Sequence, residues 1–211
     1  MKRAFPWIIA TLALVAFGAS FSELQRMRGR FGEITRIQDR HPADYTEFLI
    51  RAQLAETKGA ILIVGDSITA RAKFPTHIAG RPIINGGIGG ATIEDFEGIA
   101  ARLAGNPSLI VIALGTNNDA DSIRSSYPRL LGVLKEKSAR LLAVGVTPQA
   151  GAAAKNMALK QAADRAGVRF IEVSMPEGGT LSDRIHLSDA GYRTWTPAIA
   201  TAILERTAAA K

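Results

Sequence analysis

Short apolar runs recur along the chain from residue 60 onward. They are continuous rather than alternating with polar residues, which is the pattern of strands that are buried on both faces of a sheet. Turn-forming Gly, Asn, Thr or Pro residues follow the first four. The five strands expected from these runs are Ala60–Val64, Pro82–Ile84, Leu109–Leu114, Leu141–Val146 and Val168–Val173.

The segments between these runs carry apolar residues at steps of three and four, which predicts amphipathic helices. Pro128 is expected to start or kink one of them. Alternating strands and helices predict a parallel sheet covered by helices on both faces. The expected fold class is therefore α/β, a three-layer α/β/α sandwich with a five-stranded parallel sheet, over residues 59–211. The helices are expected at Ile93–Leu103, Ser122–Lys137, Asn156–Ala166 and Ala190–Ala209.

Residues 22–58 have a helical pattern of their own. An apolar stripe recurs at steps of three and four up to Ile37, but it is too short to argue for a coiled coil. His41-Pro42 is expected to break this helix, and a second amphipathic helix is expected over 43–56, ending at Lys58-Gly59. This part is interpreted as a helical spacer rather than as a second domain.

The first 21 residues have the pattern of an export signal. Lys2 and Arg3 precede an uncharged stretch from Phe5 to Phe21 that is rich in Ile, Leu, Ala, Val and Phe. The pattern fits a cleaved signal peptide or a retained membrane anchor, and in either case the rest of the chain would be exported to a periplasmic or other extracytoplasmic location. The alternative is a buried N-terminal helix of a cytosolic protein.

Composition narrows the possible chemistry. The 211 residues are 47% hydrophobic and 21% charged, which is typical of a folded domain with some additional sequence. The absence of cysteine excludes disulfides and thiol catalysis. The net charge is +7, but the Lys and Arg residues are scattered and not interleaved with aromatic residues, so we expect no nucleic-acid partner. A preference for anionic substrates stays open, and the sequence does not indicate an oligomeric state.

A candidate nucleophile follows the first expected strand. Ligands of such sheets bind outside the carboxyl ends of the strands, and Gly65-Asp66-Ser67-Ile68-Thr69 lies at that position. A serine on a tight turn there would present its hydroxyl at the sheet edge, although it needs a neighbouring base to be activated. The alternative is that Ser67 or Thr69 only caps the following helix.

The candidate base is one of three histidines. His41 lies in the spacer and His77 in a loop-like stretch, whereas His186 follows Asp183 by three residues just before the last expected helix. An aspartate at this distance can hold one tautomer of the ring and leave its other nitrogen free to accept a proton. A local helix-capping arrangement of Asp183 and His186 is the alternative.

Two loops offer donors for an oxyanion. The stretch from Asn85 to Thr92 is rich in glycine, which frees backbone N–H groups, and Gly115-Thr116-Asn117-Asn118 supplies a side-chain amide. Ordinary turn chemistry is the alternative for both loops. No Walker motif with its lysine is present, so phosphate binding is not indicated.

These four blocks resemble those of the SGNH hydrolases, also called the GDSL family, in the family's order and over roughly Gly59 to the end. The resemblance implies a serine esterase or acylhydrolase that needs no metal or organic cofactor. It implies a triad of Ser67, His186 and Asp183. It also implies an oxyanion hole made of the Ser67 N–H, the Gly90 N–H (with Gly89 the next candidate) and the Asn117 amide.

One position departs from the family pattern, because many members carry Asp where this chain has Asn118. The loops after the strands are short and no lid is evident, which favours short acyl esters on a glycan or a small molecule. An O-acetyltransferase with the same triad and a non-catalytic glycan-binding or assembly module of the cell envelope are the alternatives. A receiver-like domain would need an acidic cluster after the first strand, where Asp66 is alone.

Overall fold

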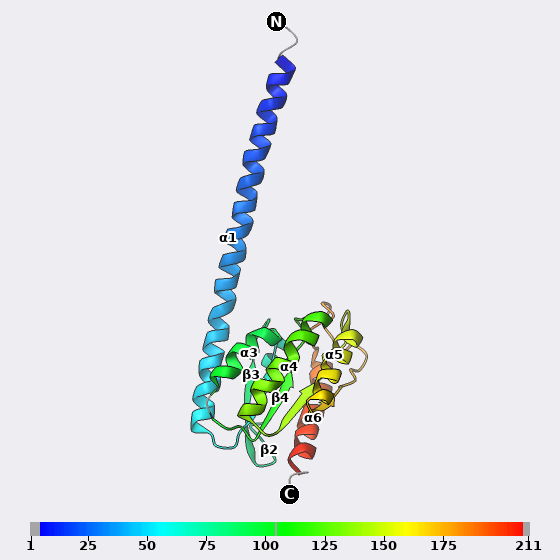
Figure 1. Cartoon of the computed structure of the whole chain (residues 1–211). Helices are drawn as coiled ribbons and strands as arrows, with labels where there is room; N and C mark the ends of the chain where they lie inside the picture. Colours follow the sequence, from blue (N-terminus) through cyan, green and yellow to red (C-terminus); the bar gives the residue numbers. More distant parts are fainter. Residues whose placement is uncertain (1–4, 104, 209–211) are drawn as a thin grey trace. The chain divides into compact units, whose positions relative to one another are not determined.

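The computed structural model describes residues 5–103 and 105–208. Its internal contacts divide the chain at His41/Pro42 into two units. In the first unit, the described residues belong to the N-terminal part of helix α1 (Phe5–Glu56). The second unit contains the last turns of α1 and all other elements (Figure 1). Lys2, Arg3 and Ala209, on which the sequence predictions also relied, lie outside the described residues.

Helix α1 is continuous, so the predicted break at His41-Pro42 is wrong. A proline inside a helix removes one backbone hydrogen bond and introduces a clash with the preceding turn, yet α1 continues through Pro42 to Glu56. The helix also has no end near residue 21. It stops at Glu56, close to the predicted end at Lys58-Gly59. No helix within residues 5–208, as far as they are described, is long and apolar enough to cross a membrane.

The second unit is built around a six-stranded sheet with the order β2-β3-β1-β4-β5-β6. Five strands are parallel, as predicted: β1 (Ile61–Gly65), β3 (Arg81–Gly87), β4 (Leu109–Ala113), β5 (Leu141–Val144) and β6 (Arg169–Ile171).

The sixth strand, β2 (His77–Ile78), corrects the predicted strand count. It pairs antiparallel with the start of β3 through a hairpin turn at Ala79-Gly80, where both residues have positive φ (51° and 72°). Two-residue hairpin turns favour this backbone region. A strand of two residues carries no hydrophobic periodicity, and the sequence prediction missed it for that reason.

The apolar runs are continuous because the central strands are buried on both faces. In β1, Leu62 and Val64 pack into one hydrophobic cluster while Ile61 and Ile63 pack into the other, and all four are fully buried. Side chains alternate between the two faces of a strand, so every position of β1 needs an apolar residue.

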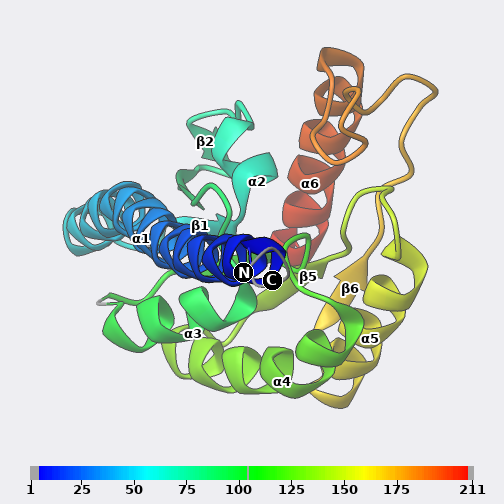
Figure 2. The same ribbon diagram turned by 90° about the horizontal axis from the view of Figure 1, so that it is seen from above.

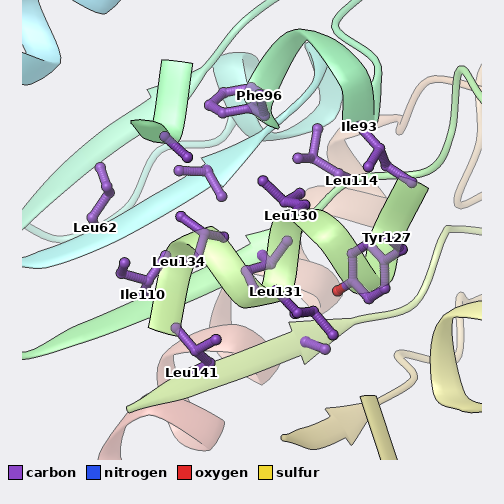
Figure 3. Packing of buried hydrophobic residues seen from close by; sticks show 14 of the residues in the cluster. Leu62, Ile93, Phe96, Ile110, Leu114, Tyr127, Leu130, Leu131, Leu134 and Leu141 are labelled. Atoms are coloured by element: carbon purple, nitrogen blue, oxygen red, sulfur yellow. The ribbon is translucent and has the colours of Figure 1, made fainter. Parts of the chain in front are cut away.

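Helices cover the two faces of the sheet (Figure 2). Helices α3 (Ile93–Arg102), α4 (Ala120–Lys137) and α5 (Ala152–Arg165) bury one cluster, part of which is drawn in Figure 3. The other cluster is buried by α2 (Ser67–Arg71) and α6 (Asp189–Ala208). The fold is thus the expected three-layer α/β/α sandwich. Pro128 lies inside α4 and Pro197 inside α6 without ending either helix.

Candidate active site

The three candidate loops lie at one edge of the sheet. Strand β1 lies between β3 and β4, and Gly65 at its carboxyl end is in register with Gly87 of β3 and Ala113 of β4. The turn that carries Ser67 is therefore flanked on one side by the glycine-rich loop after β3 and on the other by the loop after β4. This arrangement follows from parallel pairing, because the carboxyl ends of neighbouring strands meet at one edge.

The turn between β1 and α2 is tightly packed. Asp66 caps α2, since its Oδ1 accepts a hydrogen bond from the Ile68 N–H at 2.9 Å, and Ser67 is the first residue of the helix. A Cβ at Gly65 would lie 1.9 Å from Oγ1 of Thr69 and 2.9 Å from the carbonyl oxygen of Ala113. Only glycine fits this close approach, and the position of Ser67 depends on it.

Ser67, His186 and Asp183 form a continuous hydrogen-bonded chain. The Ser67 Oγ lies 2.9 Å from Nε2 of His186, and Nδ1 of His186 lies 2.6 Å from Oδ2 of Asp183. The other Asp183 oxygen accepts hydrogen bonds from the backbone N–H groups of Ile185 and His186, at 2.9 and 3.0 Å. A carboxylate that is fixed in this way holds the imidazole so that Nε2 faces the serine hydroxyl.

The charge state of Asp183 suits an orienting role. The hydrogen bond with the His186 ring, followed by the two backbone N–H groups, lowers the pKa of Asp183 to about 2. The side chains of His186 and Asp183 remain 24% and 44% exposed, so the triad is open to solvent. Asp183 is thus ionised across the neutral and mildly acidic range and can stabilise a protonated imidazole.

The residues expected to bind an oxyanion lie in the flanking loops. Gly90 adopts a positive φ of 74°, which turns the chain after β3, and Ala91 follows it. The Asn117 amide donates one hydrogen bond to the Ala91 carbonyl at 3.0 Å, which ties the two loops together. An amide nitrogen carries two hydrogens, so a second donor of Asn117 is left for a ligand. Among the described residues, no backbone carbonyl accepts a hydrogen bond from the N–H groups of Ser67 and Gly90.

Asn118, the departure from the family pattern, is the centre of a polar network that sequence reasoning did not predict. It is buried, and its Oδ1 accepts a hydrogen bond from the Ile93 N–H at the start of α3. Its amide nitrogen donates to Oε2 of Glu94 at 2.7 Å and to Oγ of Ser122 at 2.9 Å. Asparagine fits here because the site requires an acceptor and two donors, and an aspartate cannot donate when it is ionised.

The charge of Glu94 depends on this network. Partial burial alone would raise the pKa of Glu94, but the hydrogen bonds from Ser122, from the backbone and from Asn118 together outweigh it and lower the pKa to about 2. An ionised Glu94 in turn fixes the Asn118 amide. The network joins the loop that carries Asn117 to α3 and α4, and so it helps to fix the position of Asn117.

Asp66 is a second polar group beneath the site, and the sequence analysis gave it no part in the catalytic chemistry. It is 1% exposed, and its Oδ2 has no hydrogen-bond partner among the described residues. Burial raises the pKa of Asp66, while Thr116, the Ile68 N–H and the His186 ring offset part of the rise. Thr147, whose hydroxyl also lacks a partner, lines the same small cavity. The available signal was an aspartate directly after a fully apolar strand.

The other histidines do not join the triad. His77 is exposed in β2 and hydrogen-bonds the Thr76 hydroxyl, while His41 belongs to the other unit. Among the described residues, no three His, Cys, Asp or Glu side chains are grouped so that they could hold a metal ion. The chemistry that this arrangement can carry out is nucleophilic attack by a serine with proton transfer to a histidine.

One family model matches the part of the chain that carries this site. The model of the GDSL-like Lipase/Acylhydrolase family matches residues 63–194, a range that includes Ser67, Gly90, Asn117, Asp183 and His186. No curated protein matches the chain.

Several solved structures share the fold at low sequence identity. A protein from Bacteroides ovatus assigned as a GDSL-like lipase is 15% identical, with a TM-score of 0.60, and the match covers 72% of this chain. That match spans only 54% of the Bacteroides protein. A catalytic variant of an acetylxylan esterase from Geobacillus stearothermophilus is 16% identical, with a TM-score of 0.57 and coverage of 71% and 94% of the two chains. An α/β hydrolase from the metagenome of Lake Arreo is 15% identical, with a TM-score of 0.58 and coverage of 70% and 97%.

Proposed function

The chain belongs to the GDSL-like lipase/acylhydrolase family, whose members are carboxylic ester hydrolases, and from that premise we propose that it cleaves esters with Ser67 as nucleophile, His186 as general base and Asp183 as the orienting carboxylate. The observation that carries the proposal is the hydrogen-bonded chain from the Ser67 Oγ through both ring nitrogens of His186 to Asp183, with distances of 2.9 and 2.6 Å.

In the first half of the reaction, the Ser67 Oγ attacks the ester carbonyl while its proton moves to Nε2 of His186. Asp183, whose pKa is held at about 2, stays ionised and stabilises the imidazolium. The C–O bond to the alcohol then breaks, and the proton on Nε2 goes to the leaving oxygen. An acyl group remains on Ser67.

The negative charge of the tetrahedral intermediate needs donors in fixed positions. The Ser67 N–H, the Gly90 N–H and the second amide hydrogen of Asn117 fill this role in the proposal. All three lie at the carboxyl edge of adjacent strands, and Asn117 is held in place by its bond to the Ala91 carbonyl. Preorganised donors of this kind are worth about 2.7–4 kcal/mol each.

In the second half, water takes the place of the alcohol. His186 removes a proton from the water as it attacks the acyl carbonyl, and returns that proton to the Ser67 Oγ when the acid leaves. Every proton is accounted for by Ser67, His186, water and the two products. The cycle therefore balances with water as its co-reactant.

We further propose short acyl groups on a glycan or a small molecule as the substrate class. The open triad and the short loops around it support small acyl groups, and the acetylxylan esterase from Geobacillus stearothermophilus is a structural neighbour that acts on such a substrate. The export pattern of residues 1–21 supports a site of action outside the cytoplasm, with residues 5–21 as a membrane tether if the segment is retained. Cell fractionation and N-terminal sequencing of the mature protein test the location.

The test of the chemistry is hydrolysis of 4-nitrophenyl acetate and butyrate by the purified full chain. Ser67→Ala and His186→Ala should each reduce kcat by about 10⁶-fold. Ser125→Ala is a matched control, because Ser125 is exposed on α4, which covers the face of the sheet opposite α2 and α6. It should have wild-type rates.

Two other outcomes point to the alternative functions. A folded chain that hydrolyses neither ester and is not labelled at Ser67 by a fluorophosphonate contradicts the proposal and favours a glycan-binding module. Faster loss of the ester in the presence of a sugar, with the acyl group recovered on that sugar, identifies an acyltransferase.

A further inference from the structure

A cleft of about 760 Å³ lies beside the triad, between α2 and the first half of α6. Its volume falls within the roughly 300–1,000 Å³ that is usual for small-molecule sites. None of Ser67, His186 and Asp183 lines it, so it is a neighbouring space and not the reaction centre itself. Figure 2 shows α2 and α6 side by side on the same face of the sheet.

The cleft and the triad share their supporting elements. Arg71 lines the cleft and is the last residue of α2, whereas Ser67 is the first. Residues four apart lie on the same side of a helix, about 6 Å apart along its axis. On the other wall, Tyr192 follows His186 by six residues, and its hydroxyl donates a hydrogen bond to the Ile68 carbonyl at 2.9 Å. The Arg71 end of the cleft thus lies about one helical turn from Ser67.

The charge of the cleft is positive. Arg71, Lys73 and Arg193 line it and are exposed to solvent, and Asp189 is the acidic residue that lines it with them. None of these three basic side chains forms a salt bridge within the described part of the chain. This distinguishes them from Arg102, Arg124, Arg129 and Arg169, each of which is paired with a carboxylate.

The cleft also has an apolar wall, against which the uncharged part of a ligand can pack. Pro75, Pro197 and the ring of Tyr192 contribute apolar wall. Pro197 also lies inside α6, and because proline has no N–H it cannot donate to the carbonyl of Arg193 one turn earlier. The cleft thus combines cationic donors with apolar surface.

We propose that this cleft selects ester substrates that carry an anionic group, a carboxylate or a phosphate, and that Arg71, Lys73 and Arg193 bind that group while the ester lies at Ser67. The proposal rests on the proposed function for the location of the reacting ester. Guanidinium groups suit it because their planar donors match the oxygens of carboxylates and phosphates in pairs. The proposal narrows the substrate class, because a neutral acetyl ester would form no ion pair with these three basic side chains.

The first test compares charged and neutral esters of matched shape. One pair, 4-acetoxybenzoate and its methyl ester, differs in charge on the alcohol side. The other pair, mono-4-nitrophenyl glutarate and its methyl ester, differs in charge on the acyl side. The variant Arg71→Gln/Lys73→Gln/Arg193→Gln removes the basic groups of the cleft. The control variant Arg124→Gln/Lys135→Gln/Arg165→Gln removes the same charge from α4 and α5 on the opposite face of the sheet.

We expect the charged-to-neutral ratio of kcat/KM to fall by about 10- to 100-fold in the cleft variant, for at least one pair, given three partly exposed ion pairs. The control variant should keep the wild-type ratio. The wild-type ratio should also fall as salt is added, because exposed charges are screened. Equal ratios in the wild type and the cleft variant, or the same fall in the control, would overturn the proposal.

A second test does not depend on catalysis. Ser67→Ala is titrated with phenyl phosphate, benzoate and the neutral analogue benzamide, with binding followed by calorimetry. Preferred binding of phenyl phosphate or of benzoate, lost when the three cleft substitutions are added, supports the proposal and tells phosphate from carboxylate. Equal binding of all three, or no binding of any, contradicts it. Failure to hydrolyse the neutral esters would contradict the proposed function instead. In that case this titration would still show whether the cleft binds anions.

Discussion

Asn118→Asp is the substitution that would restore the residue common in the family, and the structure predicts that it is harmful here. The change replaces an amide by a carboxylate of the same shape at a buried position. The acceptor for the Ile93 N–H is retained. Both donors are lost, and the new oxygen faces Oε2 of Glu94, which lies 2.7 Å from the present amide nitrogen.

The magnitude follows from the bonds that disappear. A hydrogen bond to a charged group is worth about 1.5–3 kcal/mol and one between neutral groups about 0.5–1.5 kcal/mol. Glu94 is largely exposed on its outer side, so water weakens the repulsion and the lower part of each range applies. A total loss of about 2–3 kcal/mol at pH 7 corresponds to a fall in Tm of about 4–12 °C.

The loss should depend on pH. In the wild type the lowered pKa of Glu94 contributes stability that is present above its unfolded pKa and is lost as the pH falls toward about 2. In the variant, two adjacent carboxylates raise one pKa, so a shared proton stabilises the fold at low pH and that stability is lost as the pH rises. The difference in Tm between the two proteins should therefore shrink below roughly pH 5.

The assay is thermal unfolding of both proteins from pH 4 to pH 8. The matched control is the double variant Glu94→Gln/Asn118→Asp, which exchanges the positions of the amide and the carboxylate and should recover most of the lost stability. An Asn118→Asp protein as stable as wild type at pH 7, or a double variant no better than the single one, would refute this account of the network.

Three further predictions follow from the site. Asn117→Ala should lower kcat of ester hydrolysis by about 10²–10³-fold with little change in Tm, because it removes one oxyanion donor and a single, partly buried hydrogen bond; an unchanged kcat would remove Asn117 from the oxyanion hole. Asp183→Asn should lower kcat by about 10⁴-fold, since it favours the wrong tautomer of His186, and circular dichroism should show an intact fold. Asp66→Asn should remove a pH dependence of stability: burial raises the pKa of Asp66, so the wild type loses stability as the pH rises through that raised value, whereas an amide that keeps the Ile68 hydrogen bond does not titrate. The denaturant midpoints of the wild type and Asp66→Asn, measured between pH 4 and pH 8, should therefore converge at low pH. A constant difference between the two midpoints over this range would contradict the inference.

Much of the fold was present in the sequence because local rules fix it. A strand covered on both faces requires apolar residues at every position, which made β1 and β4 recognisable. Glycine at position 65 was recognisable as a turn residue, although the contact with Thr69 that excludes any other side chain appears only in the structure. The two-residue strand β2 and the continuous helix through Pro42 were mispredicted, because pairing and intact neighbouring turns outweigh local preference there.

The sequence by itself determined which residue types are available for the chemistry and in what order they occur: a serine after a strand, glycine and asparagine after its neighbours, and an aspartate three residues before a histidine. Only the tertiary structure decided that Ser67 and His186, 119 residues apart, lie within hydrogen-bond distance. The same holds for Asn118 with Glu94 and for the three unpaired cations around one cleft. Such contacts depend on how the helices pack on the sheet. Hydrophobic periodicity specifies which face of a helix or strand is buried, but it does not specify which polar groups come into contact once that face is buried.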